Sequence, residues 1–309
     1  MNDYDAIVIG GGPAGLAAGI YLARARQRVL IADQGTIGGQ VILTHAVANY
    51  PGLPELSGYE LARTMRRQVE EFGCTVLSNT SITEMDLSGP TKRIVTDSGE
   101  YRARAVILAV GGEPRKLGLE SELKLRGRGI SYCATCDGDF FTDEEIVVVG
   151  GGNAALEEAV SLTRYAKKIT LVHQFDTFQG FAHAIHEARE NPKINFMMES
   201  VVEEFVGEES LVAVRVRHKT DGSLTVVPAT GAFIFIGYVP GTAQLGGSVS
   251  LSKAGEIITD EAMATNLPGV FAAGDARQKR YRQITTAVSD GTIAALSALE
   301  YLSAAVAAA

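Results

Sequence analysis

Residues 5–19 read DAIVIGGGPAGLAAG, and residues 145–159 read EIVVVGGGNAALEEA. Each stretch joins a short apolar run to three glycines and then to an Ala-rich segment. This order predicts a buried parallel strand, a tight turn and a helix, which together begin a nucleotide-binding βαβ unit. Because the same unit recurs at an offset of 140 residues, we predict two domains of this kind.

In the first unit, the glycines at 10, 12 and 15 have the G-x-G-x-x-G spacing of dinucleotide sites. Gly10 permits the tight turn, Gly12 lets the backbone approach a pyrophosphate, and Gly15 lets the helix pack closely on the strand. The helix N-terminus offers N–H groups to that pyrophosphate. Asp33 follows a second strand, 29–32, and can accept hydrogen bonds from ribose hydroxyls. The first unit therefore predicts a dinucleotide site.

The second unit differs where nucleotide specificity is set. His173 stands at the position of Asp33, so the acid that favours NAD is missing. Residues 174–179 read QFDTFQ and contain no Lys or Arg for the 2′-phosphate of NADP. Each charge-assisted bond lost to such a phosphate weakens binding by ~1.5–3 kcal/mol. We interpret this as a lost NADPH site, unless an arginine from elsewhere in the chain compensates.

The remaining pattern predicts an α/β fold with two Rossmann-like, three-layer nucleotide-binding domains, the second inserted into the first. A strand near residue 270 ends in an acid, and a helix starts at about Ile284; both return to the first domain. We place residues 1–112 and 242–309 in the first domain, which is discontinuous. Residues 113–241 form the inserted domain.

Composition excludes several classes of protein. Hydrophobic residues make up 46% of the 309, which is enough for a sizeable core, and the net charge of −8 argues against nucleic-acid binding. No apolar run approaches the roughly 18–20 residues that span a bilayer, so no membrane association is expected. The acidic N-terminus runs straight into a strand and has no signal-peptide pattern. A cytoplasmic location is therefore expected.

Cys133 and Cys136 are spaced as C-x-x-C, and Asp137 follows directly. Such thiols can close a small disulfide, which takes up two electrons and passes them on; in a reducing compartment a catalytic disulfide is plausible. A zinc site would need a second cysteine pair, and the chain has only Cys74 besides. We therefore predict no metal site and interpret Cys74 as a buried apolar side chain.

These motifs resemble the low-molecular-weight thioredoxin reductase family along essentially the whole chain. The matching landmarks are GGGPAG (10–15), GGQ (38–40), NYPG (49–52), CATCDG (133–138), GGGNAALEEA (150–159), AAGD (272–275) and YRQ (281–283). The resemblance implies FAD in the first domain, a homodimer, and a disulfide in the second domain that faces the flavin. The FAD contacts that it implies are Gly10, Gly12, Pro13, Ala14, Gly15, Asp33, Gln40, Asn49, Gly274, Asp275, Arg282 and Gln283.

The resemblance also implies roles for the redox residues. Cys136 is expected to be the flavin-side sulfur, Cys133 the sulfur that attacks the protein substrate, and Asp137 the acid that manages the proton. The implied partner is thioredoxin.

One departure from the family concerns the electron donor. The usual pyridine-nucleotide signature is His-Arg-Arg followed three residues later by Arg, but here His173 is followed by Gln174 and Phe175, with Gln179 further on. This pattern resembles the pyridine-nucleotide-independent branch of ferredoxin-linked thioredoxin reductases, which implies ferredoxin as donor. Two basic clusters could dock an acidic donor: one is Lys124, Arg126 and Arg128, and the other is Arg277, Lys279, Arg280 and Arg282.

Three other functions fit parts of the same pattern. The chain could be an NADPH-dependent thioredoxin reductase with an altered NADPH site. It could be a flavin dithiol oxidase that closes disulfides in small molecules and hands the electrons to oxygen. It could also be a flavin-containing redox sensor without catalytic activity, although the complete CATCD stretch argues against that.

Overall fold

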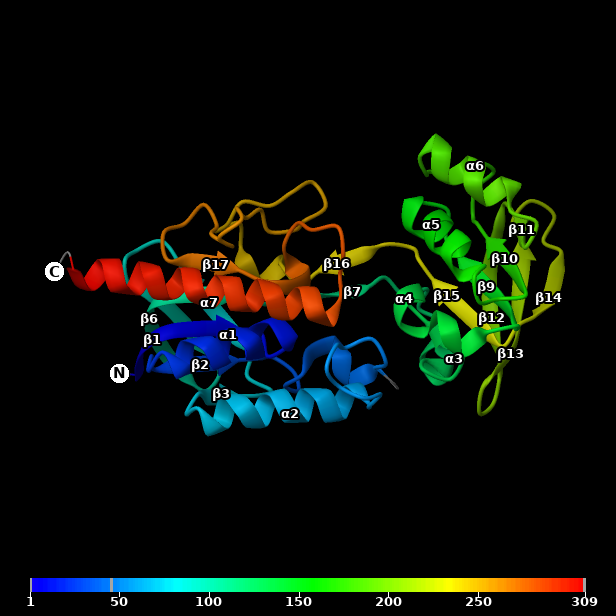
Figure 1. The fold of residues 1–309 in the computed structure, drawn as a ribbon. Helices are drawn as coiled ribbons and strands as arrows, with labels where there is room; N and C mark the ends of the chain where they lie inside the picture. The colour runs from blue at the N-terminus through cyan, green and yellow to red at the C-terminus, as the bar shows by residue number, and fades with distance from the viewer. Residues whose placement is uncertain (1, 45–46, 308–309) are drawn as a thin grey trace. The chain divides into compact units, whose positions relative to one another are not determined.

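The computed structural model describes residues 2–44 and 47–307. The chain divides into two compact units. Unit 1 comprises Met1–Glu113 and Val239–Ala309, and unit 2 comprises Pro114–Tyr238 (Figure 1).

Unit 1 is built on a seven-stranded sheet in the order β3-β2-β1-β6-β5-β4, with β17 also paired to β6. The strands nearest the first glycine turn are parallel, whereas β4, β5 and β6 pair antiparallel. The core strands are almost wholly buried because both faces of the sheet are covered. The strands are β1 (Asn2–Ile9), β2 (Val29–Ala32), β3 (Thr75–Leu77), β4 (Ile82–Asp86), β5 (Lys92–Thr96), β6 (Gly99–Leu108) and β17 (Val270–Ala272).

Three helices cover one face of this sheet: α1 (Pro13–Arg24), α2 (Gly58–Glu71) and α7 (Ile284–Ala307). Helix α1 lies between α2 and α7 (Figure 1). The helix α2 starts at a capping box, in which the Ser57 hydroxyl accepts the Glu60 N–H and the Glu60 carboxylate accepts the Ser57 N–H. On the other face, the sheet packs against residues 245–257.

Unit 2 has a five-stranded parallel sheet in the order β11-β10-β9-β15-β8. Helices α5 (Asn153–Leu162) and α6 (Ala182–Glu190) share a core with one face. A three-stranded antiparallel sheet packs on the other face. The parallel strands are β8 (Ile130–Ser131), β9 (Glu145–Val149), β10 (Lys168–Val172), β11 (Ile194–Met197) and β15 (Gly231–Ile234), and the antiparallel strands are β12 (Ser200–Gly207), β13 (Leu211–His218) and β14 (Leu224–Pro228).

The predicted α/β fold with two Rossmann-type sheets is therefore confirmed. The two glycine-containing segments that join the units pair with each other. Strands β7 (Gly112–Pro114) and β16 (Tyr238–Pro240) pair into a two-stranded sheet. The Arg115 N–H donates to the Gly237 carbonyl (3.0 Å), and the Gly241 N–H donates to the Gly111 carbonyl (2.9 Å). In the part of the chain that the structure describes, no helix combines the length and apolarity needed to cross a bilayer.

The packing of α7 on α1 depends on Gly291. A Cβ at this position would lie 2.0 Å from the Ala14 carbonyl oxygen and 2.9 Å from its carbon. The two helix backbones therefore approach each other more closely than any residue with a side chain would allow. Because Ala14 is in the first turn of α1, this contact also fixes where the glycine turn lies against α7.

We predict that Gly291→Ala destabilises unit 1 by about 1–3 kcal/mol, because α7 must shift to relieve the clash. The same substitution at an unobstructed helix position would instead stabilise by about 0.5–1 kcal/mol. Urea-induced unfolding followed by circular dichroism measures the change, with Ser303→Ala on the exposed part of α7 as the control. An unchanged or higher unfolding midpoint for Gly291→Ala would contradict this account of the helix contact.

Candidate active site: two glycine turns and a disulfide

The turn between β1 and α1 is closed by contacts that only glycine allows. Gly10 has φ of +107°, and a Cβ on it would lie 2.1 Å from the Ala109 carbonyl oxygen. A Cβ on Gly15 would lie 1.9 Å from the Gly10 carbonyl oxygen. Gly12 is the N-cap of α1, Pro13 occupies the first helical position, and no described side chain caps this end. The N-terminal N–H groups of α1 are thus presented at the turn, where they suit a pyrophosphate.

Residues from the next loop fold back onto this turn. The Asp33 carboxylate accepts the Gly11 N–H (2.6 Å) through Oδ2 and the Gly35 N–H (2.7 Å) through Oδ1. The Gly38 N–H donates to the Gly11 carbonyl at 2.7 Å. Gln40 follows in the short helix η1 (Gly39–Leu43), where its side chain is exposed. Asp33 thus lies at the turn, and each of its oxygens retains acceptor capacity for a ribose hydroxyl.

The Gly274–Asp275 pair lies in the short helix η4 (Gly274–Ala276), against the same turn. Gly274 has φ of +76°, and a Cβ on it would lie 2.9 Å from the Cβ of Ala14. The Asp275 Oδ1 atom is buried and has no hydrogen-bond partner among the described residues. Burial raises the pKa of this carboxyl, while Lys279 and Arg282 act in the opposite direction. A buried acceptor beside an open glycine turn fits a ligand that donates a hydrogen bond, as a flavin dinucleotide can.

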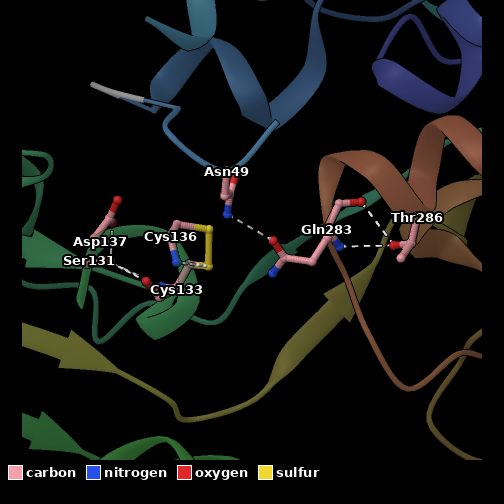
Figure 2. The surroundings of a disulfide bond; sticks show 7 residues. All are labelled: Asn49, Ser131, Cys133, Cys136, Asp137, Gln283 and Thr286. Atoms are coloured by element: carbon pink, nitrogen blue, oxygen red, sulfur yellow. Dashed lines mark hydrogen bonds between the residues drawn. A yellow bond between two sulfur atoms is a disulfide. The ribbon is translucent and has the colours of Figure 1, made fainter. Parts of the chain in front are cut away.

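Asn49 and Gln283 form a second group within unit 1. The Asn49 Nδ2 donates to the Gln283 Oε1 at 3.4 Å (Figure 2). The Gln283 N–H donates to the Thr286 hydroxyl (3.1 Å), which in turn donates to the Gln283 carbonyl (3.0 Å). Arg282 forms an ion pair with Glu256. The residues that the family resemblance implies as flavin contacts therefore lie in unit 1. One group surrounds the glycine turn, and the other surrounds Gln283.

Most of the basic cluster at residues 277–282, which we considered as a docking patch, forms ion pairs within unit 1. Arg277 and Lys279 both bind the buried Asp290 carboxylate, at 3.3 and 2.7 Å, with side chains only 15% and 8% exposed. Arg282 is also paired with an acid. Three of the four cations are paired inside unit 1 with two carboxylates, Asp290 and Glu256, which reduces the charge that this cluster presents to an acidic partner.

At the second glycine turn, residues 150–152, the imidazole ring of His173 takes the place that the Asp33 carboxylate has at the first turn. The His173 imidazole lies so close to Gly151 that a Cβ there would be 2.2 Å from it. The ring is stacked with Phe178 (centroids 5.5 Å apart), and its Nε2 lies 3.1 Å from the Thr177 carbonyl. His173 is buried, and this burial lowers its pKa, although its hydrogen bonds act in the opposite direction. It is therefore neutral near pH 7 and supplies no charge to a phosphate.

The loop after His173 also folds back onto its turn. The Gln179 N–H donates to the Gly151 carbonyl at 2.8 Å, as Gly38 does to Gly11 in unit 1. Gln174, Phe175 and Gln179 are exposed. A cation from elsewhere does reach this loop: the Lys219 ammonium donates to the Gln174 carbonyl (3.0 Å) and lies 5.4 Å from the centre of the Phe175 ring.

The predicted pairing of Cys133 with Cys136 is confirmed, with an S–S distance of 2.15 Å. Cys133 is the N-cap of the short helix α4 (Ala134–Asp137), and its Sγ accepts the Cys136 N–H at 3.2 Å. The Asp137 Oδ2 accepts a hydrogen bond from the Ser131 hydroxyl at 2.5 Å (Figure 2). The Cys136 N–H is thus directed at Cys133 Sγ, and an amide donor at this atom favours negative charge on it.

The third cysteine has no such environment. Cys74 is a free, buried thiol, and burial raises its pKa to about 11. It would carry almost no thiolate at neutral pH, and the prediction of an apolar structural role is confirmed. Over the described residues there is no group of three or more His, Cys, Asp or Glu side chains placed to hold a metal ion.

Comparisons with known proteins agree with this geometry. A family model described as pyridine nucleotide-disulphide oxidoreductase matches residues 4–291. The thioredoxin reductase of Peptoclostridium acidaminophilum is 44% identical over 310 residues, covering 98% of this chain and 98% of that protein. Two solved thioredoxin reductases, from Streptococcus pyogenes MGAS5005 and Giardia duodenalis, are 40% and 32% identical with TM-scores of 0.94 and 0.93. They cover 98% of this chain, and this chain covers 99% and 100% of theirs.

The chain therefore belongs to the pyridine nucleotide-disulphide oxidoreductases and, within them, to the low-molecular-weight thioredoxin reductases. Sequence reasoning had missed two residues near the site. Ser131 has a signal, because it lies two residues before the cysteine pair. Asp290 has a weaker one, as one of two acids in an Ala-rich helix.

We predict that Asp275→Asn stabilises the flavin-free protein at pH 7 but weakens FAD binding about tenfold. Because the folded-state pKa of Asp275 is raised, its stability contribution is present below the unfolded value of about 3.9 and is lost as the pH rises. The unfolding temperature should therefore exceed that of the unsubstituted protein at pH 7 and match it near pH 3.5.

Differential scanning fluorimetry and FAD titration measure the two effects, with the exposed Asp176→Asn as control. A lower unfolding temperature at pH 7 together with unchanged FAD affinity would show that Asp275 is satisfied without the cofactor.

Proposed function

We propose that this chain is a FAD-dependent disulfide reductase that passes electrons through the Cys133–Cys136 disulfide to thioredoxin, with reduced ferredoxin rather than NADPH as the electron donor. The observation that carries the proposal is the cysteine pair, in which an amide N–H is directed at Cys133 Sγ and an acid follows Cys136. Membership of the thioredoxin reductase family supports thioredoxin as the substrate. It also supports a cytoplasmic homodimer.

In this proposal residues 1–112 and 242–309 form the FAD-binding domain, and residues 113–241 carry the disulfide. The N-terminal N–H groups of α1 would hold the pyrophosphate, Asp33 would accept from a ribose hydroxyl, and Asp275 Oδ1 would accept from a further hydroxyl. Bound FAD would supply a group that takes electrons singly and delivers them in pairs, which suits a one-electron iron–sulfur donor.

The cysteines perform thiol–disulfide exchange once they are reduced. The Cys133 thiolate attacks a substrate sulfur, so that a mixed disulfide forms and the substrate's S–S bond breaks; the released substrate thiolate takes up a proton. Cys136 then loses its proton and attacks Cys133 Sγ, which re-forms the internal disulfide and releases the second substrate thiolate. Asp137 would accept and return the Cys136 proton. Two electrons and two protons pass to the substrate.

The case for ferredoxin rests on the charge of the second glycine turn. Gln174, Phe175 and Gln179 stand where the family's pyridine-nucleotide signature has arginines. His173 is neutral because it is buried. A 2′-phosphate there would lose bonds worth ~1.5–3 kcal/mol each. The other basic cluster, residues 124–128, stays available for an acidic partner: Lys124 and Arg128 are exposed, and the third cation is Arg126.

One observation favours the alternative of an NADPH-dependent reductase with an altered site. Lys219 brings an ammonium group to the loop at Gln174, where it could meet a phosphate. We rank this second, because Lys219 is a single cation that already donates to a carbonyl and lies by an aromatic ring.

We predict that reduced ferredoxin bleaches the flavin absorbance within seconds under anaerobic conditions. NADPH and NADH, tested in parallel, should leave most of it after minutes. Stopped-flow absorbance near 450 nm measures all three reactions, with free FAD as the control for non-enzymatic reduction. Full bleaching by NADPH within about a second, at a rate expected for enzyme turnover, would replace the ferredoxin proposal by the alternative.

Restoring the arginines tests the same proposal from the protein's side. We predict that the triple variant Gln174→Arg, Phe175→Arg and Gln179→Arg binds NADPH at least about a hundredfold more tightly, because two or more charge-assisted bonds are regained. Isothermal titration calorimetry measures the dissociation constant, and Gln68→Arg on the exposed face of α2 is the control for added charge. An unsubstituted chain that binds NADPH as tightly as the triple variant does would refute a lost site.

A further inference from the structure

Ser131 lies beside the cysteine pair but is not part of it. It is the last residue of β8 and is 5% exposed. Its hydroxyl donates to Asp137 Oδ2 at 2.5 Å and accepts the Cys133 N–H at 3.1 Å. The Cys133 carbonyl, 3.4 Å away, is a second possible acceptor for the hydroxyl proton. Figure 2 shows Ser131 directed at Asp137, next to the disulfide.

These contacts link the hydroxyl to the ionisation of Asp137. A hydroxyl has one proton, so it donates either to the carboxylate or to the Cys133 carbonyl. Donation to the carboxylate is favoured when Asp137 is charged, because charge-assisted bonds are the stronger ones. When Asp137 holds a proton, the hydroxyl can turn to the carbonyl while it still accepts the Cys133 N–H. The Ser131 hydroxyl can therefore change its hydrogen-bond acceptor when Asp137 gains or loses a proton.

We infer that Ser131 is a positioning residue, whose hydroxyl holds the Asp137 carboxylate for the proton transfers that accompany opening and closing of the Cys133–Cys136 disulfide. This inference rests on the proposed function, in which Asp137 accepts the Cys136 proton and returns it to the leaving substrate thiolate. No other reactant is needed, since Ser131 forms no covalent bond and changes only the partner of its proton.

The backbone around Ser131 is held without this hydroxyl. Ser131 pairs with Phe233 in the parallel sheet. The next residue, Tyr132, donates its hydroxyl to the buried Glu122 carboxylate at 2.7 Å. Glu122 also accepts the N–H groups of Leu117 (3.2 Å) and Gly118 (2.9 Å). Removing the Ser131 hydroxyl should therefore leave the fold intact and change mainly the surroundings of Asp137.

The chain offers a matched control. Ser200 is 2% exposed, lies in the same unit, and donates its hydroxyl to the Met198 carbonyl at 2.7 Å. Ser200→Ala removes the same atoms from an equally buried serine that bonds only to backbone. Ser131→Thr, by contrast, keeps the hydroxyl at the site and serves as the conservative variant.

The experiment measures exchange without the electron donor or thioredoxin. The full-length protein is reduced with dithiothreitol, desalted anaerobically, and mixed with a small aromatic disulfide, 5,5′-dithiobis(2-nitrobenzoate), between pH 5 and 9. Two thionitrobenzoate anions are released per chain and are followed at 412 nm. The first leaves when Cys133 attacks the reagent, and the second leaves when Cys136 closes the internal disulfide, so the second phase gives the rate of closure. The variants are Ser131→Ala, Ser131→Thr, Ser200→Ala, Asp137→Asn and the double variant Ser131→Ala with Asp137→Asn.

We expect Ser131→Ala to slow closure about tenfold at pH 7 and to move the acidic limb of the pH profile upward by about one unit, because loss of a donor disfavours the charged carboxylate. Ser131→Thr should stay within about threefold of the unsubstituted protein, and Ser200→Ala within about twofold. In the Asp137→Asn background, Ser131→Ala should add less than about twofold, since both act through one group.

Two results would overturn the inference while leaving the proposed function in place: a Ser131→Ala profile that matches Ser200→Ala, or a Ser131→Ala effect that is undiminished in the Asp137→Asn background. A reduced, unsubstituted protein that fails to close its disulfide would overturn the proposed function and the inference together.

Discussion

The close approach of α1 to the end of β1 is the constraint on which the first site depends. Since a Cβ on Gly15 would lie 1.9 Å from the Gly10 carbonyl oxygen, only glycine lets the helix start where it does. The N-terminus of α1 then faces the turn, and the loops that carry Asp33 and Gly274 pack against it. Unit 2 repeats the arrangement less tightly, with Ala155 in the third position, where a Cβ on Gly150 would lie 2.8 Å from the Ala155 Cβ.

The two units differ in the side chain that packs against this shared turn. In unit 1, the Asp33 carboxylate lies at the turn and accepts the Gly11 N–H. In unit 2, the His173 ring lies against Gly151 and is neutral because it is buried. At equivalent positions, Asp33 thus provides a hydrogen-bond acceptor to the first turn, and His173 provides an uncharged ring to the second. The same backbone turn therefore has different chemical surroundings in the two units.

Much of the fold was predictable, because buried parallel strands are continuous apolar runs and glycines mark their ends. The pairing of Cys133 with Cys136 was also predictable, since it depends on local spacing. The pairing of β7 with β16 was not, because three-residue strands carry no periodic signal. The ion pairs of Arg277 and Lys279 with Asp290 were missed for a different reason: Asp290 lies on the next helix, and only the fold brings it to them.

The central claim is that a bound flavin and the Cys133–Cys136 disulfide form one electron-accepting system. An anaerobic titration with dithionite, followed by flavin absorbance and by the number of free thiols, tests it most directly. The account predicts that each chain takes up four electrons, two in the flavin and two in the disulfide, and that a Cys136→Ser variant takes up two. A purified chain without flavin, or one whose disulfide stays oxidised after the flavin is fully reduced, would contradict it.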